Sequence, residues 1–177
     1  VEHQDAFACV GRLQEEILRC AKKMNSVLAK GGRVFICGNG GSAADAQHFA
    51  AELTNRFETE RRGYPAIALT TDTSAITAIG NDFGFEFIFS RQLEALAHPG
   101  DMLIGISTSG NSANVVQAVE SAHAKDMFSV GLLGRDGGRL AEKVDLPLIV
   151  GASRTARIQE AHIFILHILC ELFEAQL

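Results

Sequence analysis

Two side chains that could share a metal ion or a proton, His48 and Glu52, lie four residues apart. This spacing places both on one face of a helix. The surrounding residues, from Ala43 to Leu53, are mostly small or apolar. An imidazole and a carboxylate on one face could bind zinc or act as an acid–base pair. A hydrogen-bonded surface pair explains the same spacing, so the spacing alone leaves these possibilities open.

A second group of polar side chains interrupts the apolar segment 155–176, and consists of Gln159, Glu160, His162 and His167. His167 stands in an almost wholly apolar run, where a buried histidine requires a partner. It is therefore either a satisfied core residue or part of a site. The roles of Asp45, Gln47 and His162 stay open between groups that orient ligands and ordinary polar positions on a helix.

A glycine-rich turn, Gly38-Asn39-Gly40-Gly41-Ser42, follows the short apolar run Arg33–Cys37. Glycines let the backbone approach a ligand closely, and the first N–H groups of a following helix attract anions. A plain strand-to-helix turn accounts for the same residues equally well. The turn is not a dinucleotide fingerprint, because Gly-x-Gly-x-x-Gly does not fit Gly38–Ala43.

The segment Ser107-Thr108-Ser109-Gly110-Asn111-Ser112 follows the apolar run Met102–Ile106. One hydroxyl is enough to cap a helix, so four hydroxyls and a glycine at a helix N-terminus favour a phosphate site. It is not a Walker A loop, since the Gly-Lys-Ser/Thr element is absent. Asn81-Asp82 stands before Phe83-Gly84, where it either forms a turn or bonds to sugar hydroxyls.

Short apolar runs alternate with helical patterns along the chain. The expected strands are Arg33–Cys37, Ala66–Leu69, Met102–Ile106, Phe128–Leu133 and Leu146–Val150. The expected helices cover 5–30, 42–57 with Ser42 as N-cap, a short stretch capped by Asp72 or Thr73, 85–96, 112–124, a short stretch ending near 143, and 155–176. The alternation predicts an α/β fold: a five-stranded parallel sheet covered on both faces, with extra N- and C-terminal helices. Such sheets bind ligands beyond the carboxyl ends of their strands, where both turns fall.

The composition indicates an ordinary globular protein of one domain, with 177 residues, 47% hydrophobic and 21% charged. A net charge of −5 and the lack of a Lys/Arg run predict no nucleic-acid partner. The densest basic spot, Arg61-Arg62, is expected in a solvated loop. No apolar run has transmembrane length, which predicts no membrane partner. The cysteines lack metal or redox spacing and fit a reducing cytoplasm: Cys9, Cys20, Cys37 and Cys170.

Together these motifs resemble the SIS (sugar isomerase) domain family. The resemblance rests on Gly38-Asn39-Gly40-Gly41-Ser42, Asp45-Ala46-Gln47-His48-Phe49 and Ser107-Thr108-Ser109-Gly110-Asn111-Ser112. Three further segments narrow it to the phosphoheptose isomerases: Asn81-Asp82-Phe83-Gly84-Phe85, Asp136-Gly137-Gly138 and Arg157-Ile158-Gln159-Glu160. The resemblance covers nearly the whole chain and implies a single SIS domain over 1–177, a three-layer sandwich assembled as a homotetramer.

The resemblance also implies an aldose–ketose isomerase. Such an enzyme converts sedoheptulose 7-phosphate to D-glycero-D-manno-heptose 7-phosphate through an enediol, for the lipopolysaccharide core and other bacterial surface glycans. Glu52 is then the implied base and His167 the implied acid. One Zn²⁺ per subunit is implied at His48, Glu52, Gln159 and His167. Substrate contacts are implied for Asn39, Gly40, Gly41, Glu52, Asn81, Asp82, Ser107, Thr108, Ser109, Ser112 and Gln159.

Two details of the sequence bear on this implied site. Some members of the family carry an acidic residue where this chain has Ala156, so no carboxylate role is carried over to that position. Gln159 and His167 are eight residues apart, which places them about 12 Å apart along a helix and about 80° apart around it. Two such side chains converge with difficulty, which predicts a site near a subunit interface, with another chain supplying some groups.

Two other functions remain possible from the sequence. An isomerase of another sugar phosphate would show the same phosphate turn. A non-catalytic SIS-domain scaffold that binds a replication-initiator protein is the second possibility, since such relatives exist within the family. Those relatives lack the matching glutamate and second histidine, whereas this chain keeps Glu52 and His167, and this difference favours the isomerase.

Overall fold

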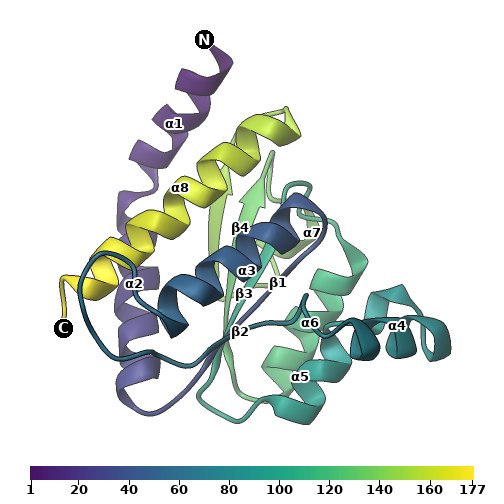
Figure 1. Cartoon of the computed structure of the whole chain (residues 1–177). Helices are drawn as coiled ribbons and strands as arrows, with labels where there is room; N and C mark the ends of the chain where they lie inside the picture. Colours follow the sequence, from purple (N-terminus) through teal and green to yellow (C-terminus); the bar gives the residue numbers. More distant parts are fainter.

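A computed structural model describes all of residues 1–177, and a single parallel sheet forms its centre (Figure 1). The strands are β1 (Val34–Gly38), β2 (Ala66–Ala68), β3 (Met102–Ser107), β4 (Phe128–Gly134) and β5 (Leu146–Val150). Their order across the sheet is β2-β1-β3-β4-β5, and every neighbouring pair is parallel. The predicted five-stranded parallel sheet is therefore confirmed.

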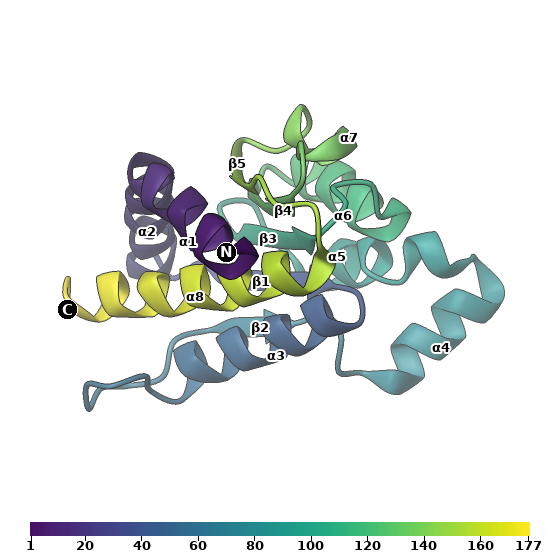
Figure 2. The same ribbon diagram turned by 90° about the horizontal axis from the view of Figure 1, so that it is seen from above.

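Helices cover both faces of this sheet. They are α1 (Glu2–Arg12), α2 (Gln14–Ala29), α3 (Gly41–Thr54), α4 (Thr73–Asp82), the 3₁₀ turn η1 (Phe85–Phe87), α5 (Ser90–Leu96), α6 (Ala113–Ala124), α7 (Gly138–Ala141) and α8 (Thr155–Glu174). One core cluster unites α1, α2, α3 and α8 with one face of the sheet, and the other unites α5, α6 and α7 with the opposite face. Figure 2 shows the resulting three layers from above. No helix combines the length and the apolar character that a membrane crossing requires.

Both faces of the central strands are buried, which explains their continuous apolar sequences. In β1, Val34 and Ile36 belong to the cluster under α3 and α8, whereas Phe35 and Cys37 belong to the cluster under α5 and α6. Successive side chains of a strand point to opposite faces, so one short strand contributes to both cores.

Two predicted helices are divided in the structure. The segment 5–30 forms α1 and α2, which meet at Leu13. The N–H of Leu13 donates to Val10 O, three residues back at 3.0 Å, so the regular α-helical hydrogen bonding stops there. The segment 85–96 forms η1 and α5, separated at Ile88. Periodicity is continuous across both breaks, which is why the sequence predicted single helices.

The helix caps agree with the sequence in one case and differ in another. The carboxylate of Asp72 accepts a hydrogen bond from the N–H of Ala75 at 2.9 Å, which confirms Asp72 as the N-cap of α4. The prediction of Ser42 as the N-cap of α3 was wrong. That position is taken by Gly40, whose φ of +57° favours glycine, and Ser42 is buried inside the helix.

The expectation of a solvated loop at Arg61 was also wrong. The Nε of Arg61 lies 2.8 Å from Glu174 Oε1, and the two side chains are only 6% and 5% exposed. The guanidinium also donates to Glu52 O at 2.7 Å and to Leu53 O at 3.0 Å. The last carbonyls of a helix lack donors within the helix, and the five N–H donors of arginine suit this position. We call this ion pair the Arg61–Glu174 pair.

The Arg61–Glu174 pair predicts a specific dependence of stability on pH. Burial alone would raise the pKa of Glu174, but the N–H groups of Thr59, Phe57 and Glu58 and the Arg61 guanidinium lower the pKa to about 2, from an ordinary 4.5. Since the folded pKa is the lower one, this stabilisation is full above pH 4.5 and is lost as the pH falls from 4.5 towards 2.

We therefore expect Glu174→Gln to lower the free energy of unfolding at neutral pH by about 1.5–3 kcal/mol, the range for hydrogen bonds to a charged group. Urea unfolding measured between neutral and acid pH checks this. The difference between wild type and variant should shrink as the solution is acidified. A difference that stays constant with pH would contradict the assignment of the shift to Glu174.

Candidate active site

The two turns predicted to bind phosphate are neighbours in the structure. β1 and β3 pair in parallel, with Gly38 opposite Ile106, so both turns leave the carboxyl edge of the sheet side by side. A Cβ atom at Gly38 would lie 2.8 Å from the Cβ of Ser42 and 3.0 Å from Ile106 O. Only glycine therefore allows the first turn to fold this tightly beside the second.

Three hydroxyl groups gather in the second turn, and we call them the hydroxyl cluster: Ser107, Ser109 and Ser112. The Oγ of Ser107 lies 3.0 Å from Ser112 Oγ and 3.5 Å from Ser109 Oγ. The cluster stands at the N-terminus of α6, whose first N–H groups lack partners within the helix. Rotatable hydroxyls and free N–H groups can together donate to a phosphate without any lysine or arginine.

Gly110 sets the shape of the second turn. Its φ is +66°, and a Cβ atom there would clash with the backbone of Gly137. The carbonyl of Gly110 accepts a hydrogen bond from the N–H of Leu140 at 3.0 Å. The turn after β3 is thus packed against the turn after β4, which explains why Asp136-Gly137-Gly138 accompanies the serine-rich motif in the sequence.

Asn114 joins the two turns, and it was not among the residues predicted from the sequence. The carboxamides of Asn39 and Asn114 exchange two hydrogen bonds, each 2.8 Å long. Asn114 is buried in the first turn of α6. A polar residue directly after a serine-rich helix start was the available signal, but the partner, Asn39, lies in a distant segment.

The helices α3 and α8 run side by side in the same direction (Figures 1 and 2). At one end, the carboxamide of Gln159 packs so closely on Gly41 that a Cβ atom at Gly41 would clash with it. Further along, His167 meets His48. Gly41 and His48 are about 10 Å apart along α3, and Gln159 and His167 about 12 Å apart along α8. The structure thus places Gln159 at the first turn and His167 about two turns of helix away.

His48, Glu52 and His167 come together between α3 and α8, and we call them the trio. The Nε2 of His48 lies 2.9 Å from Nε2 of His167 and 3.3 Å from Glu52 Oε1. One of the two Nε2 atoms carries a hydrogen and donates it to the other. Which histidine is the donor depends on the tautomers. The ring of Phe57 stacks on His167 with centroids 5.7 Å apart and planes at 27°. The sequence did not indicate this aromatic contact, because it placed Phe57 at the end of the predicted helix 42–57, whereas α3 ends at Thr54.

The ligand types of the trio suit zinc, although the atoms contact one another directly. Zinc bonds of 2.0–2.2 Å place two tetrahedral ligand atoms roughly 3.3 Å apart. The His48–Glu52 spacing equals this value, and the 2.9 Å between the imidazoles is shorter. In agreement with that shorter contact, no group of three or more His, Cys, Asp or Glu side chains is arranged to hold a metal ion. The trio therefore fits zinc in donor chemistry and would have to open by a few tenths of an ångström.

Two further ionisable groups accompany the trio on the same helices. Burial raises the pKa of Asp45 to about 6, while His48 lowers it, and Asp45 Oδ2 is buried without a partner. Burial lowers the pKa of His162 to about 4, against a hydrogen bond to Leu133 O that raises it. His162 is therefore neutral at physiological pH, and its Nε2 links α8 to the end of β4 at 3.0 Å.

Asn81 and Asp82 lie apart from the other predicted site residues. Both are exposed on α4, where the Nδ2 of Asn81 donates to Asp82 Oδ1 at 2.8 Å. None of the ten residues of α4 is buried. Figure 2 shows this helix projecting from the body of the molecule, far from α1 and α2. Within one chain, the two side chains therefore stand outside the turns and the trio.

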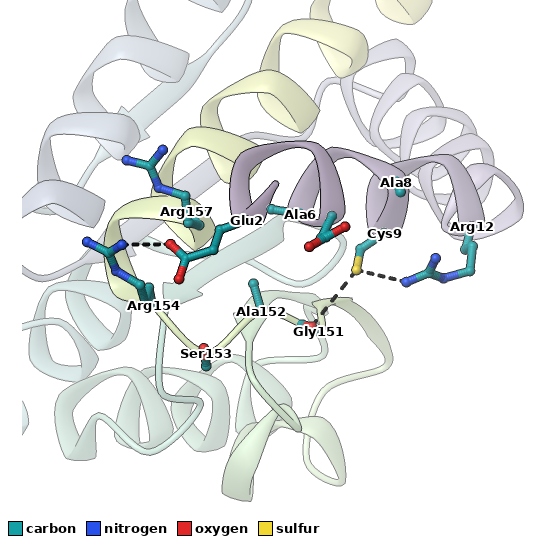
Figure 3. Close-up of a pocket in the computed structure, with 11 residues that line it drawn as sticks. Glu2, Ala6, Ala8, Cys9, Arg12, Gly151, Ala152, Ser153, Arg154 and Arg157 are labelled. Carbon is teal, nitrogen blue, oxygen red and sulfur yellow. Dashed lines mark hydrogen bonds and ion pairs between the residues drawn. The ribbon is translucent and has the colours of Figure 1, made fainter.

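One small cavity of the molecule adjoins the first turn, whereas a larger one contains none of the predicted site residues. A cavity of about 180 Å³ adjoins the first turn, and Thr70 and Phe85 also line it. A larger one, about 390 Å³, lies between α1 and the connection from β5 to α8 (Figure 3). There Arg154 pairs with Glu2 at 2.6 Å, and none of the predicted site residues lines the walls. The larger cavity therefore lies at the contact of α1 with the rest of the molecule, away from the predicted site.

Comparisons with known proteins agree with this arrangement of turns and helices. Residues 7–134 match the model of the SIS domain family. The chain is 53% identical, over 176 residues, to the phosphoheptose isomerase of Aliarcobacter butzleri, and the match covers 99% of this chain and 93% of that protein. The structure of the phosphoheptose isomerase from Neisseria gonorrhoeae has a TM-score of 0.92 at 49% identity and covers 97% of this chain and 92% of that one. The structure of a phosphoheptose isomerase from Francisella tularensis has a TM-score of 0.94 at 43% identity and covers 98% of this chain and 93% of that one.

Proposed function

The chain belongs to the SIS domain family and, within it, to the phosphoheptose isomerases, and we propose that it converts sedoheptulose 7-phosphate to D-glycero-D-manno-heptose 7-phosphate. The product would supply heptose for bacterial surface glycans. One observation carries the proposal: α3 begins beside the hydroxyl cluster and bears His48 and Glu52 opposite His167. An anion site and a proton-transfer site therefore lie along one helix.

The separation of these two sites suits a long sugar phosphate. The phosphate would lie at the turns, bound by the hydroxyl cluster and the N–H groups of α6. The sugar would extend alongside α3 and α8, past about 10 Å of helix, to the trio. The proposed contacts within the chain are Asn39, Gly40, Gly41, Glu52, Ser107, Thr108, Ser109, Ser112 and Gln159. A seven-carbon chain with its phosphate and carbonyl at opposite ends meets both sites.

The exchange of ketose and aldose moves a proton between two neighbouring carbons. In the proposed reaction, Glu52 takes the carbon-bound proton as base and His167 protonates the carbonyl oxygen as acid, which gives the enediol. Glu52 then returns the proton to the neighbouring carbon, and His167 takes the proton from the oxygen that becomes the new carbonyl. His48 lies within 2.9 Å of His167 and 3.3 Å of Glu52, so it holds the two reacting groups side by side. Phe57 fixes the plane of the His167 ring by stacking on it.

The proposal includes one Zn²⁺ per subunit, held by His48, Glu52 and His167, with Gln159 as the fourth ligand. When bound there, zinc would polarise the substrate oxygens and stabilise negative charge on them. In the chain as it stands, the Gln159 carboxamide packs on Gly41. Its long side chain would have to turn away from Gly41 along α8 to join the other ligands.

The proposal also includes a homotetramer in which the site is completed across a subunit interface. α4 buries none of its residues, and Phe83 and Phe85 beside it are 53% and 61% exposed. Exposed aromatic groups next to an unburied helix are typical of a protein–protein contact. We propose that α4 of one subunit brings Asn81 and Asp82 to the turns of another.

Replacing Glu52 tests the reaction itself. Wild-type protein should turn over sedoheptulose 7-phosphate, and Glu52→Gln should lower kcat by about a thousandfold or more, because the base is lost while the size of the side chain is kept. Product formation is followed by chromatography of the aldose phosphate. Glu58→Gln, an exposed glutamate nearby, is the control and should keep wild-type activity. A folded wild type that leaves this substrate unchanged would favour another sugar phosphate or a non-catalytic scaffold.

Metal analysis tests the zinc ligands without relying on activity. Purified wild type, loaded with zinc and dialysed, should retain about one equivalent per chain by mass spectrometry of the metal content. Removal of one imidazole in His48→Gln should weaken zinc binding by about tenfold or more. His98→Gln, in an exposed loop, should retain the wild-type amount. Equal zinc retention by His48→Gln and wild type would contradict the assigned ligands.

Mixing of inactive variants tests the shared site. Glu52→Gln and Asp82→Asn homo-oligomers should each be inactive on sedoheptulose 7-phosphate. Unfolding and refolding them together should restore activity, since some sites would then combine an intact Glu52 with an intact Asp82. Native mass spectrometry confirms that mixed tetramers have formed. Mixed tetramers without activity, or a fully active monomer, would contradict a site built across the interface.

A further inference from the structure

An irregular segment after α3 contacts the trio through one aromatic ring. α3 ends at Thr54, and β2 begins at Ala66. Within the intervening segment, Phe57 places its ring on that of His167, with the two planes only 27° apart. A ring held against an imidazole restricts how the imidazole turns about its side-chain bonds. The orientation of His167 therefore depends on where this segment is held.

The segment is held by a carboxylate on the same helix as His167. The N–H of Phe57 donates to Glu174 Oε1 at 3.0 Å, and the N–H groups of Glu58 and Thr59 donate to Oε2 at 3.0 and 2.7 Å. Glu174 follows His167 by seven residues, which is nearly two full turns of helix. The two side chains thus leave the same face of α8, and the position of Phe57 is set relative to His167 by one rigid element.

Arg61 connects the same carboxylate to the residue proposed as base. Its Nε binds Glu174 Oε1 at 2.8 Å, while its Nη2 donates to the main-chain carbonyl of Glu52 at 2.7 Å. The pair is almost completely buried. A buried ion pair adds little net stability compared with apolar packing, so its presence under a surface segment calls for another role. The Arg61–Glu174 pair holds α3, the segment between Thr54 and Ala66, and α8 in a fixed arrangement.

We propose that the Arg61–Glu174 pair is a positioning element of the active site, which sets His167 through the ring of Phe57 and sets Glu52 through its main-chain carbonyl. The inference rests on the proposed function, because Glu52 and His167 are the reacting groups that it positions. Neither member of the pair touches the proposed substrate. The pair therefore affects the chemical step and leaves phosphate binding at the turns unchanged.

Glu174→Gln tests this in steady-state kinetics with sedoheptulose 7-phosphate. We expect kcat to fall by about ten- to a hundredfold, because small displacements of reacting groups slow catalysis strongly, while KM stays within about twofold. Glu171→Gln, an exposed glutamate on the same helix, is the control and should keep the wild-type kcat. A wild-type kcat in folded Glu174→Gln, or a loss confined to KM, would overturn the proposal.

Phe57 supplies a second variant that leaves the ion pair intact. Phe57→Tyr should keep the stacking and the wild-type kcat, whereas Phe57→Leu should lower kcat by about tenfold with an unchanged KM. These two variants keep the proposal testable if Glu174→Gln does not fold. Equal kcat values for Phe57→Leu and wild type would exclude the contact with His167 as the route.

Crystal structures of the wild type and of Phe57→Leu give a measurement independent of turnover. We expect the His167 ring to turn away from its stacked orientation in the variant, so that its distance to His48 changes. An unchanged His167 ring would overturn the proposal even if activity fell. If the wild type has no isomerase activity, the proposed function fails, while the structural comparison still decides whether the ring of Phe57 sets the orientation of His167.

Discussion

The architecture depends on the packing of one helix, α8, across a face of the parallel sheet. Its apolar side chains complete the core shared by α1, α2 and α3. Its polar side chains, spaced along successive turns, each join a different part of the molecule: Gln159 packs on the first turn, His162 bonds to the end of β4, His167 meets His48, and Glu174 binds the segment after α3. Because one rigid helix makes all four contacts, the two ends of the site keep a fixed separation.

The surroundings shift the pKa values of the ionisable groups on α3 and α8 in different directions. His162 has one carbonyl partner and no compensating charge, so burial keeps it neutral. Glu174 is less completely buried than His162, and three N–H groups and a guanidinium keep it ionised. Between these extremes Asp45, with a pKa near 6, has burial opposed by the nearby His48. Burial and the hydrogen-bond donors around each group therefore act together in setting its charge.

The sequence predicted well what is local and poorly what joins distant segments. Apolar periodicity gave the five strands, because each strand of a covered parallel sheet is a short apolar run. The i, i+4 spacing placed His48 and Glu52 on one face, since a helix fixes that relation. The partnerships of Arg61 with Glu174, and of Asn39 with Asn114, join segments far apart in the chain, and no local pattern records them. An arginine beside another arginine looks solvated until its partner is known.

The order of elements along the chain has a consequence for how the protein is made. His48 and His167 are separated by 119 positions, and α8 follows all five strands. A growing chain emerges from the ribosome N-terminal end first, at roughly 5–20 residues per second. The 20 residues of α8 are added in roughly one to four seconds. Until then the face of the sheet that α8 covers lacks this helix, and neither the trio nor Glu174, the partner of Arg61, is complete. The delay before α8 packs is therefore limited by how long the apolar face of the sheet can stay partly uncovered. The chemistry of the site sets no such limit.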